Sequence, residues 1–175
     1  FPKHFVQNNI IGTFNLLEVL RKKKINPIFV QISTDEVFGS LDKNQKSFDE
    51  NSIIKPNSPY SASKASADHM VRAYNKTFGL KTIITHSANN FGERQHPEKL
   101  IPLSIMQLLS GKEIPVYGNG KNIRDWIYVK DNCKCIFELI KKSNYGQSYL
   151  IGANNEIANI DIVKKIINIF KKSSG

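Results

Sequence analysis

The chain has 175 residues, of which 40% are hydrophobic and 23% charged, with a formal net charge of +10. This balance is typical of one globular core, and no apolar run approaches the ~20 residues that a membrane span needs. No basic segment followed by an apolar one opens the sequence, so no secretory signal is visible, and we expect a cytoplasmic protein with no membrane partner.

The first elements of the chain follow a helix-then-strand pattern. Apolar residues recur at helical spacing over residues 8–23, which predicts an amphipathic helix that Asn26 and Pro27 end. Residues 28–32 form a short apolar run, typical of a buried parallel strand, and the sequence turns polar directly after it.

A long helix follows a polar stretch. Residues 40–58 have the composition of a loop. Ser58 and Pro59 are residues that begin helices, and Gly79 is one that ends them. We therefore expect a helix over residues 59–78.

The rest of the chain continues the alternation of strands and helices. This rhythm predicts an α/β protein with a parallel sheet. The further elements expected are strands at 80–85, 114–117 and 148–151, and helices at 98–110, closed by Gly111, at 130–142 and at 161–172.

One expected element is missing from the sequence. Sheets of this class normally open with a strand, a glycine-rich turn and a helix that seats the pyrophosphate of a dinucleotide. Here the sequence begins in a helical pattern, and neither Gly-x-Gly-x-x-Gly nor Gly-x-x-Gly-x-x-Gly occurs in it. We therefore expect the chain to be the middle of a longer protein.

The positive charge gathers near the ends of the predicted helices. The basic clusters lie at 21–24, 141–142, 164–165 and 171–172. Cations there complement the helix dipole, and no aromatic residues interleave with them as a stacking platform for nucleic acid requires. We therefore expect no nucleic-acid partner.

Cysteine and histidine usage argues against a metal. Cys133 and Cys135 are one residue apart on a predicted helix and so lie on different faces. The four histidines form no His-x-x-x-His pair. Neither a disulfide framework nor a metal site is expected.

Tyr60 and Lys64 stand at positions i and i+4 of the predicted helix over 59–78, hence on one face. A phenol is a poor base at neutral pH, but a neighbouring ammonium favours the phenolate and lowers the pKa. Tyr60 is therefore a candidate general base. The alternative is an exposed surface pair without a catalytic role.

Two acids, Asp35 and Glu36, follow the predicted strand at the edge where open α/β sheets bind ligands. Adjacent acids in one cleft can be driven to different protonation states, which supplies an acid and a base. A helix cap would explain one of the two acids, but not both.

These motifs together carry a family resemblance. Residues 33–39 (STDEVFG) and 59–64 (PYSASK) resemble the dTDP-glucose 4,6-dehydratase family of the extended short-chain dehydrogenase/reductase superfamily. The acid pair is the discriminating part, because epimerases of the superfamily lack it. The likeness continues through residues 87–92, 96–102, 115–118, 123–126 and 149–152, and so covers essentially the whole chain.

The resemblance implies an NAD-dependent lyase that removes water from dTDP-glucose in deoxysugar (rhamnose-type) biosynthesis. Tyr60 would take the proton of the sugar 4-hydroxyl, and Lys64 would depress the tyrosine pKa and hold the nicotinamide ribose. Glu36 would remove the C5 proton, Asp35 would protonate the departing C6 hydroxyl, and Thr34 would hydrogen-bond the 4-oxygen.

The resemblance also implies binding residues. For NAD they are Ser33, Tyr60, Lys64 and Asn90. For the nucleoside-diphosphate sugar they are Thr34, Asn89, Lys99, Leu100, Pro115, Tyr117, Arg124 and Asn159. Pro115 and Tyr117 match the base-binding strand and Arg124 the phosphate-binding arginine. Each has another interpretation: Lys99 as a first-turn lysine, Tyr117 as strand packing, Arg124 as an ion pair with Asp125.

Residues 1–93 would then be part of a Rossmann-like NAD-binding domain with the catalytic residues, and 94–175 part of a smaller α/β sugar-nucleotide domain. A homodimer through the helices at 8–23 and 59–78 is implied as well. The open alternatives are a UDP-glucose 4,6-dehydratase, a 4-epimerase or decarboxylase of the superfamily, and a nucleotide- or RNA-binding scaffold. We expect this polypeptide alone not to hold NAD tightly.

Overall fold

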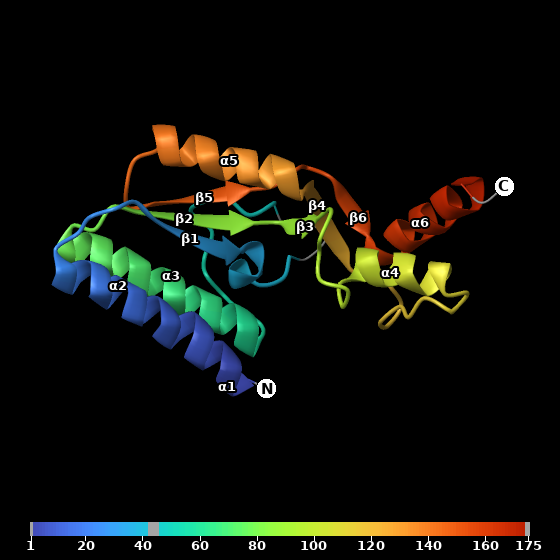
Figure 1. Ribbon diagram of the computed structural model, residues 1–175, viewed down its shortest axis with the longest axis horizontal. Coiled ribbons are helices and arrows are strands. Elements are labelled where there is room, and N and C mark those ends of the chain that lie inside the picture. Colours follow the sequence, from blue (N-terminus) through green and yellow to red (C-terminus); the bar gives the residue numbers. More distant parts are fainter. Residues whose placement is uncertain (1, 42–45, 174–175) are drawn as a thin grey trace. The chain divides into compact units, whose positions relative to one another are not determined.

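A computed structural model describes residues 2–41 and 46–173 (Figure 1). Helices and strands alternate along most of the chain, and the larger sheet is entirely parallel. The expected α/β class is confirmed.

The chain divides into two compact units. The first comprises Phe1–Ser87 and Lys134–Ile151, and the second Ala88–Cys133 and Gly152–Gly175. The functional division at residue 93, into a cofactor and a sugar-nucleotide domain, stays a prediction.

The first unit opens with continuous helix. It consists of α1 (Pro2–Phe5), the π-helical turn η1 (Val6–Ile11) and α2 (Gly12–Lys23), so the helix expected over 8–23 begins earlier. It ends where Lys24 adopts a left-handed conformation with φ 54°. A π turn widens the helix locally, and such turns are frequent at functional sites.

Three parallel strands, in the order β1-β2-β5, form the sheet of this unit. They are β1 (Phe29–Thr34), β2 (Thr82–Ser87) and β5 (Gln147–Ile151). The first two run two residues beyond the expected 28–32 and 80–85. The polar residues at these ends stay in the strands because pairing with neighbouring strands continues there, and composition alone does not show this.

Helices cover both faces of the sheet. Figure 1 shows α2 and α3 (Pro59–Phe78) on one side and α5 (Val129–Lys142) on the other, where α5 belongs to this unit from Lys134 on. In the parallel register Thr34 pairs with Ser87, so both strands end at one edge. Coverage on both faces explains why all six residues of β2 are buried.

The limits of α3 agree with the expected helix over 59–78. The Ser58 hydroxyl accepts from the Ser61 amide at 3.0 Å and the Ser61 hydroxyl accepts from the Ser58 amide at 3.1 Å, which is a capping box. Gly79 closes the helix with φ 69°. Within the expected loop over 40–58, residues 42–45 lie outside the described residues.

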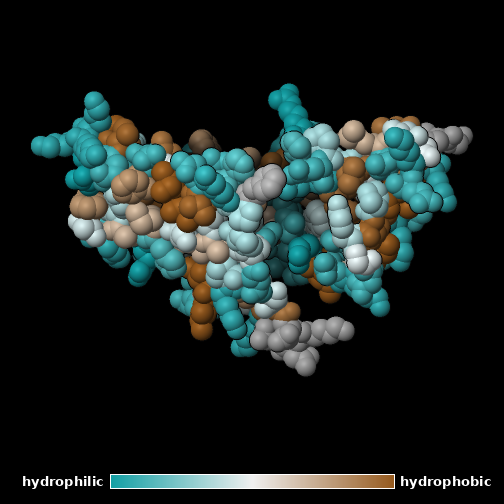
Figure 2. All heavy atoms as spheres, turned by 90° about the horizontal axis from the view of Figure 1, so that it is seen from below, coloured by the Kyte–Doolittle hydropathy of each residue, from teal (hydrophilic) through white to brown (hydrophobic). Residues whose placement is uncertain are grey.

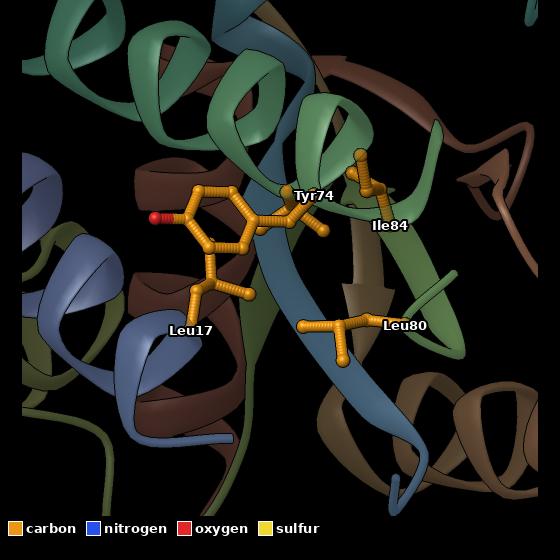
Figure 3. Packing of buried hydrophobic residues seen from close by; sticks show 5 residues of the cluster. Leu17, Tyr74, Leu80 and Ile84 are labelled. Atoms are coloured by element: carbon orange, nitrogen blue, oxygen red, sulfur yellow. The ribbon is translucent and has the colours of Figure 1, made fainter. Parts of the chain in front are cut away.

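An apolar cluster fixes α2 and α3 on the sheet. It contains Leu17 of α2, Val71 and Tyr74 of α3, Leu80 and Ile84, and Figure 3 shows four of these side chains pointing toward one another. Contacts from helix, loop and strand in one cluster set how α3, which carries Tyr60 and Lys64, lies against β1.

The rim of this cluster carries a pH-dependent contact. Glu18 accepts hydrogen bonds from Arg21 at 2.7 Å and from the Tyr74 hydroxyl at 2.7 Å. These bonds lower the pKa of Glu18 from 4.5 to about 2. A carboxyl with a lowered pKa stabilises the fold above its unfolded-state pKa and loses that contribution as the pH falls through its folded-state pKa.

We therefore expect Glu18→Gln to melt at a lower temperature than the wild type at neutral pH. The difference should shrink as the pH falls from 4.5 toward about 2. Thermal melts at a series of pH values measure it. Tyr74→Phe removes one of the hydrogen-bond donors to Glu18 and should reduce the pH-dependent difference in melting temperature. A difference that stays constant with pH would contradict the assignment.

The second unit holds a smaller mixed sheet in the order β3-β4-β6. β4 (Ile123–Tyr128) pairs parallel with β3 (Asn89–Phe91) and antiparallel with β6 (Glu156–Ala158). The helices of this unit are α4 (Leu100–Leu109) and α6 (Asn159–Ser173). None of the three strands was expected from the sequence.

The strand expected at 114–117 is wrong, because these residues have no strand partner and form an irregular segment. Pro115 within it has no amide hydrogen to give to a ladder. The helices expected at 98–110, 130–142 and 161–172 are confirmed to within two residues.

Other expectations concern absences. Cys133 and Cys135 are free and exposed. Within residues 2–41 and 46–173, no cluster of three or more His, Cys, Asp or Glu side chains could hold a metal ion. In the same part of the chain, no helix combines the length and apolar character needed to cross a bilayer.

Candidate active site

The acid pair lies on a short helix that starts directly at the end of β1. The 3₁₀ helix η2 (Asp35–Phe38) has Thr34 as its N-cap, whose hydroxyl oxygen accepts from the Glu36 amide at 3.3 Å. The same hydroxyl donates to Asp35 Oδ1 at 3.3 Å. A helix therefore does begin here, but its cap is the threonine, so a capping role explains neither acid.

Gly39 ends η2 with φ 91°, and a Cβ atom there would collide with the Lys55 carbonyl oxygen. Glycine is thus required at this position. The tight turn keeps the acid pair at the carboxyl edge of the sheet, with Asp35 half-buried and Glu36 exposed.

Tyr60 and Lys64 occupy the first two turns of α3, and both are half-buried. The ring of Phe5 packs edge-on against Tyr60 with 5.5 Å between centroids. Lys64 Nζ donates to the carbonyl of Ile32 in β1 at 2.5 Å. The pair is therefore anchored to the strand that leads into the acid pair, which argues against a simple surface pair.

The pKa of the Tyr60 phenol is raised, first by burial and then by the negative charges of Glu36, Asp35 and Asp68. Both acids act electrostatically on the phenol, so the acid pair and the Tyr60–Lys64 pair belong to the same region of the first unit. Burial lowers the pKa of Lys64, and Asp68 opposes this.

The expected lowering of the Tyr60 pKa is therefore wrong for the chain as described. The physical reason is that three carboxylates and the loss of water disfavour a phenolate.

Sequence reasoning missed Asn9, which lies in the π-helical turn η1. Its side-chain amide donates to the Ser63 hydroxyl at 2.9 Å, and Ser63 donates to the Tyr60 carbonyl at 2.7 Å. Asn9 thus supports the first turn of α3. The available signal was a polar Asn8-Asn9 pair within an amphipathic helical pattern.

Most of the other predicted binding residues line a cavity of about 140 Å³ in the second unit. Its lining is rich in amide side chains and includes two cations. The residues are Asn89, Asn90, Gln95, Lys99, Leu100, Arg124, Trp126 and Asn159. Asn89, Lys99, Leu100, Arg124 and Asn159 were expected to bind substrate, and Asn90 to bind NAD.

A second cavity, of about 170 Å³, shares Lys99, Leu100 and Asn159 with the first. Pro115 and Tyr117, the two residues expected near the base, line it. Amide and cationic groups on one side and an aromatic ring on the other suit a ligand with both a charged and a planar part.

Three amide oxygens of the first cavity are buried without a hydrogen-bond partner among residues 2–41 and 46–173. They belong to Asn90, Gln95 and Asn159. A buried unpaired acceptor costs about 1–3 kcal/mol, so these atoms indicate a ligand that carries donors. Gln95 was not predicted. Its own amide donates to the Asn90 carbonyl at 2.8 Å, which holds it at the cavity wall.

The structure also decides two alternatives. Tyr117 is 87% exposed and belongs to no strand, so its interpretation as strand packing is wrong. Asp125 accepts from the amides of Ala153 and Asn155 at 2.8 and 2.9 Å, and the ion pairs found among the described residues do not include Arg124 with Asp125. Lys99 lies 3.4 Å from Glu98 in an exposed ion pair, which contributes little to stability.

Comparison with known proteins decides the family. The sequence model of a family described as GDP-mannose 4,6 dehydratase matches residues 1–174. The chain belongs to this family. A match over the whole described chain covers both compact units, including the acid pair and the Tyr60–Lys64 pair.

Curated relatives confirm the expected resemblance. The dTDP-glucose 4,6-dehydratase of Escherichia coli is 47% identical over 184 residues, covering 96% of this chain and 51% of the relative. The chain thus spans about half the length of the curated relatives it matches.

Solved structures agree. A dTDP-glucose 4,6-dehydratase from Bacillus anthracis in complex with NAD superposes with a TM-score of 0.89 at 47% identity, covering 95% of this chain and 53% of that one. DesIV, a dTDP-glucose 4,6-dehydratase from Streptomyces venezuelae with NAD and TYD bound, gives 0.91 at 40% identity, covering 95% and 51%. The Rossmann-like fold class is therefore confirmed.

Proposed function

We propose that the protein containing this chain catalyses the NAD-dependent 4,6-dehydration of dTDP-glucose to dTDP-4-keto-6-deoxyglucose and water. One observation carries the proposal: Lys64 donates to the carbonyl of Ile32 in β1, the strand that leads directly into the acid pair on η2. A site for hydride transfer alone needs the Tyr60–Lys64 pair only. Elimination of water needs an additional acid and base.

The residues present fit an NAD site in part. Tyr60 and Lys64 lie at the carboxyl edge of the parallel sheet, where such folds bind ligands. Asn90 carries a buried amide oxygen without a partner. Bound NAD⁺ would supply the hydride acceptor for C4 of the sugar and the hydride donor for C6, and its positive charge would favour the Tyr60 phenolate. The role of Ser33 stays a prediction, since its hydroxyl donates to Asp68.

Tyr60 takes the proton of the 4-hydroxyl as the C4–H bond breaks, and Lys64 stabilises the phenolate. Thr34, fixed by its contacts with Asp35 and the Glu36 amide, offers its hydroxyl to the 4-oxygen. The resulting 4-keto group acidifies the C5 hydrogen, which prepares the second half of the reaction.

Glu36 then removes the C5 proton, and Asp35 gives a proton to the C6 hydroxyl as the C6–O bond breaks and water leaves. A proton later returns to C5. The net change is redox-neutral. The two acids differ in exposure, with Asp35 half-buried and Glu36 exposed.

The proposal assigns the nucleoside diphosphate to the cavities of the second unit. The planar guanidinium of Arg124 suits diphosphate oxygens. Tyr117, at 87% exposure, offers its ring as a stacking surface for the base. Uracil and thymine present the same pyrimidine face to such a ring, so UDP-glucose is the natural competitor.

We further propose a cytoplasmic homodimer that serves 6-deoxysugar synthesis of the rhamnose type. Apolar side chains are exposed on α2, among them Phe14 at 37%, Leu16 at 59% and Val19 at 52%. Figure 2 shows apolar patches among the hydrophilic side chains on the helical side of the first unit. Patches of this kind are typical of association surfaces, and a second copy of the chain is the partner proposed.

The test is an assay of the complete protein with dTDP-glucose and UDP-glucose, followed by mass spectrometry of the products. We expect a product lighter by one water from dTDP-glucose, with a higher kcat/KM than from UDP-glucose. A product of unchanged mass indicates a 4-epimerase instead. No turnover, together with RNA binding at physiological salt, would favour a scaffold.

A further inference from the structure

Three buried polar side chains form one group in the elements that carry the candidate site. Asp68 of α3 is 3% exposed, Ser33 of β1 6% and His86 of β2 3%. The Ser33 hydroxyl donates to Asp68 Oδ2 at 2.6 Å. His86 Nε2 lies 3.3 Å from the same oxygen. Asp68 therefore joins the helix to two strands through a single carboxylate.

The group connects the two catalytic pairs along the chain. Asp68 follows Lys64 by one helical turn and Tyr60 by two, so the three share one face of α3. Ser33 directly precedes residues 34–36, which hold the acid pair. The hydrogen bond between Ser33 and Asp68 thus connects the end of β1, next to the acid pair, to the face of α3 that carries Tyr60 and Lys64.

His86 extends the group to the helix that bears the acids. Its ring lies 4.9 Å from the ring of Phe38, edge-on at 66°. Phe38 is the last residue of η2 and is 5% exposed. This packing restrains the C-terminal end of η2, and the Thr34 cap restrains its N-terminal end. Both ends of the helix that carries Asp35 and Glu36 are therefore held in place.

Stability alone does not account for the group. Apolar residues of similar volume usually stabilise a core as well as a buried polar network does. Asp68 Oδ1 and His86 Nδ1 are buried without a partner among the described residues, which further reduces any net gain. The group does fix one relative arrangement of α3, β1 and η2.

We propose that Asp68, with Ser33 and His86, is a positioning residue that sets the Asp35–Glu36 pair against the Tyr60–Lys64 pair. The inference rests on the proposed function for its catalytic meaning. Misplacing reacting groups by about 1 Å can lower turnover about 100-fold. None of Ser33, Asp68 and His86 is among the residues proposed to bind the sugar nucleotide, so the KM for dTDP-glucose should be spared.

The test uses the complete protein and three variants. Asp68→Ala removes the carboxylate, and Asp68→Asn keeps an oxygen that can accept from Ser33. Val71→Ala is the matched control, because Val71 is fully buried on the same helix but belongs to the apolar cluster with Leu17. For each we measure the melting temperature, kcat and KM for dTDP-glucose, and hydrogen exchange of residues 29–38.

Asp68→Ala should lower kcat by about 10- to 100-fold at unchanged KM. It should also speed exchange across 29–38. Asp68→Asn should recover much of the loss. Val71→Ala should lower the melting temperature and leave kcat and this exchange unchanged. If Asp68→Ala does not fold, Ser33→Ala is used in its place. It should likewise lower kcat at unchanged KM for dTDP-glucose and speed exchange across 29–38.

The outcomes separate the inference from the proposed function. A wild-type protein without activity on nucleotide sugars contradicts the function, and the exchange comparison then decides the inference. An active wild type in which Asp68→Ala matches Val71→Ala in kcat and in exchange overturns the inference.

Discussion

Replacing Tyr60 by phenylalanine is expected to lower the turnover of dTDP-glucose by about 10²–10⁴-fold, the range that general acid–base catalysis contributes. The change removes one oxygen atom and keeps the ring that packs against Phe5. The phenol is already difficult to ionise, since burial and three carboxylates raise its pKa. Without it no side chain remains to take the 4-hydroxyl proton, so oxidation at C4 should fail together with the later steps.

The matched control for this change is Tyr149→Phe. It also removes a tyrosine hydroxyl, which donates a 3.4 Å hydrogen bond to the Asn144 carbonyl, away from the site. Steady-state assays on both variants, with melting temperatures, make the comparison. We expect kcat to fall in Tyr60→Phe alone, at similar melting temperatures. Equal activity of the two variants would remove Tyr60 from the mechanism.

The second large effect concerns the acid pair. Glu36→Gln and Asp35→Asn should each lower formation of the dehydrated product by about 10²–10³-fold, because each removes an acid or base needed to eliminate water. Glu36→Gln also removes a negative charge that acts on Tyr60, so the pKa of the phenol should fall in that variant. The rate of oxidation at C4 should therefore fall less than the rate of elimination of water.

Deuterium exchange at C5 separates the two acids. In deuterated water, Glu36→Gln should lose incorporation at C5, while Asp35→Asn should retain it and yet release no water. Glu138→Gln, which removes an exposed carboxylate on α5, serves as the charge control. Full dehydration by both variants would refute the dehydratase proposal and favour an epimerase.

Local chemistry explains what could be predicted about the fold. Ser58, Pro59 and Gly79 define α3 because capping and left-handed termination depend only on neighbouring residues. The same holds for the candidate residues in 33–36 and 60–64, whose types and spacing suit a single chemistry. These features are written in short segments, so the sequence is sufficient to find them.

Other features depend on partners far along the chain. β3, β4 and β6 are short, and they exist because β4 finds partners at both edges. Residues 114–117 have a strand-like composition but no such partner. Pairing between distant segments is a tertiary event, and composition within a segment does not reveal it.

The sequence by itself determined the Tyr60–Lys64 pair, the acid pair and the family they indicate. Only the tertiary structure decided the sign of the Tyr60 pKa shift, because the shift depends on burial and on charges from η2 and from a later turn of α3. It likewise decided the contacts of Asp68 with Ser33 and His86, which come from three separate elements. Electrostatics and buried hydrogen bonds act through space, so distance along the chain does not predict them.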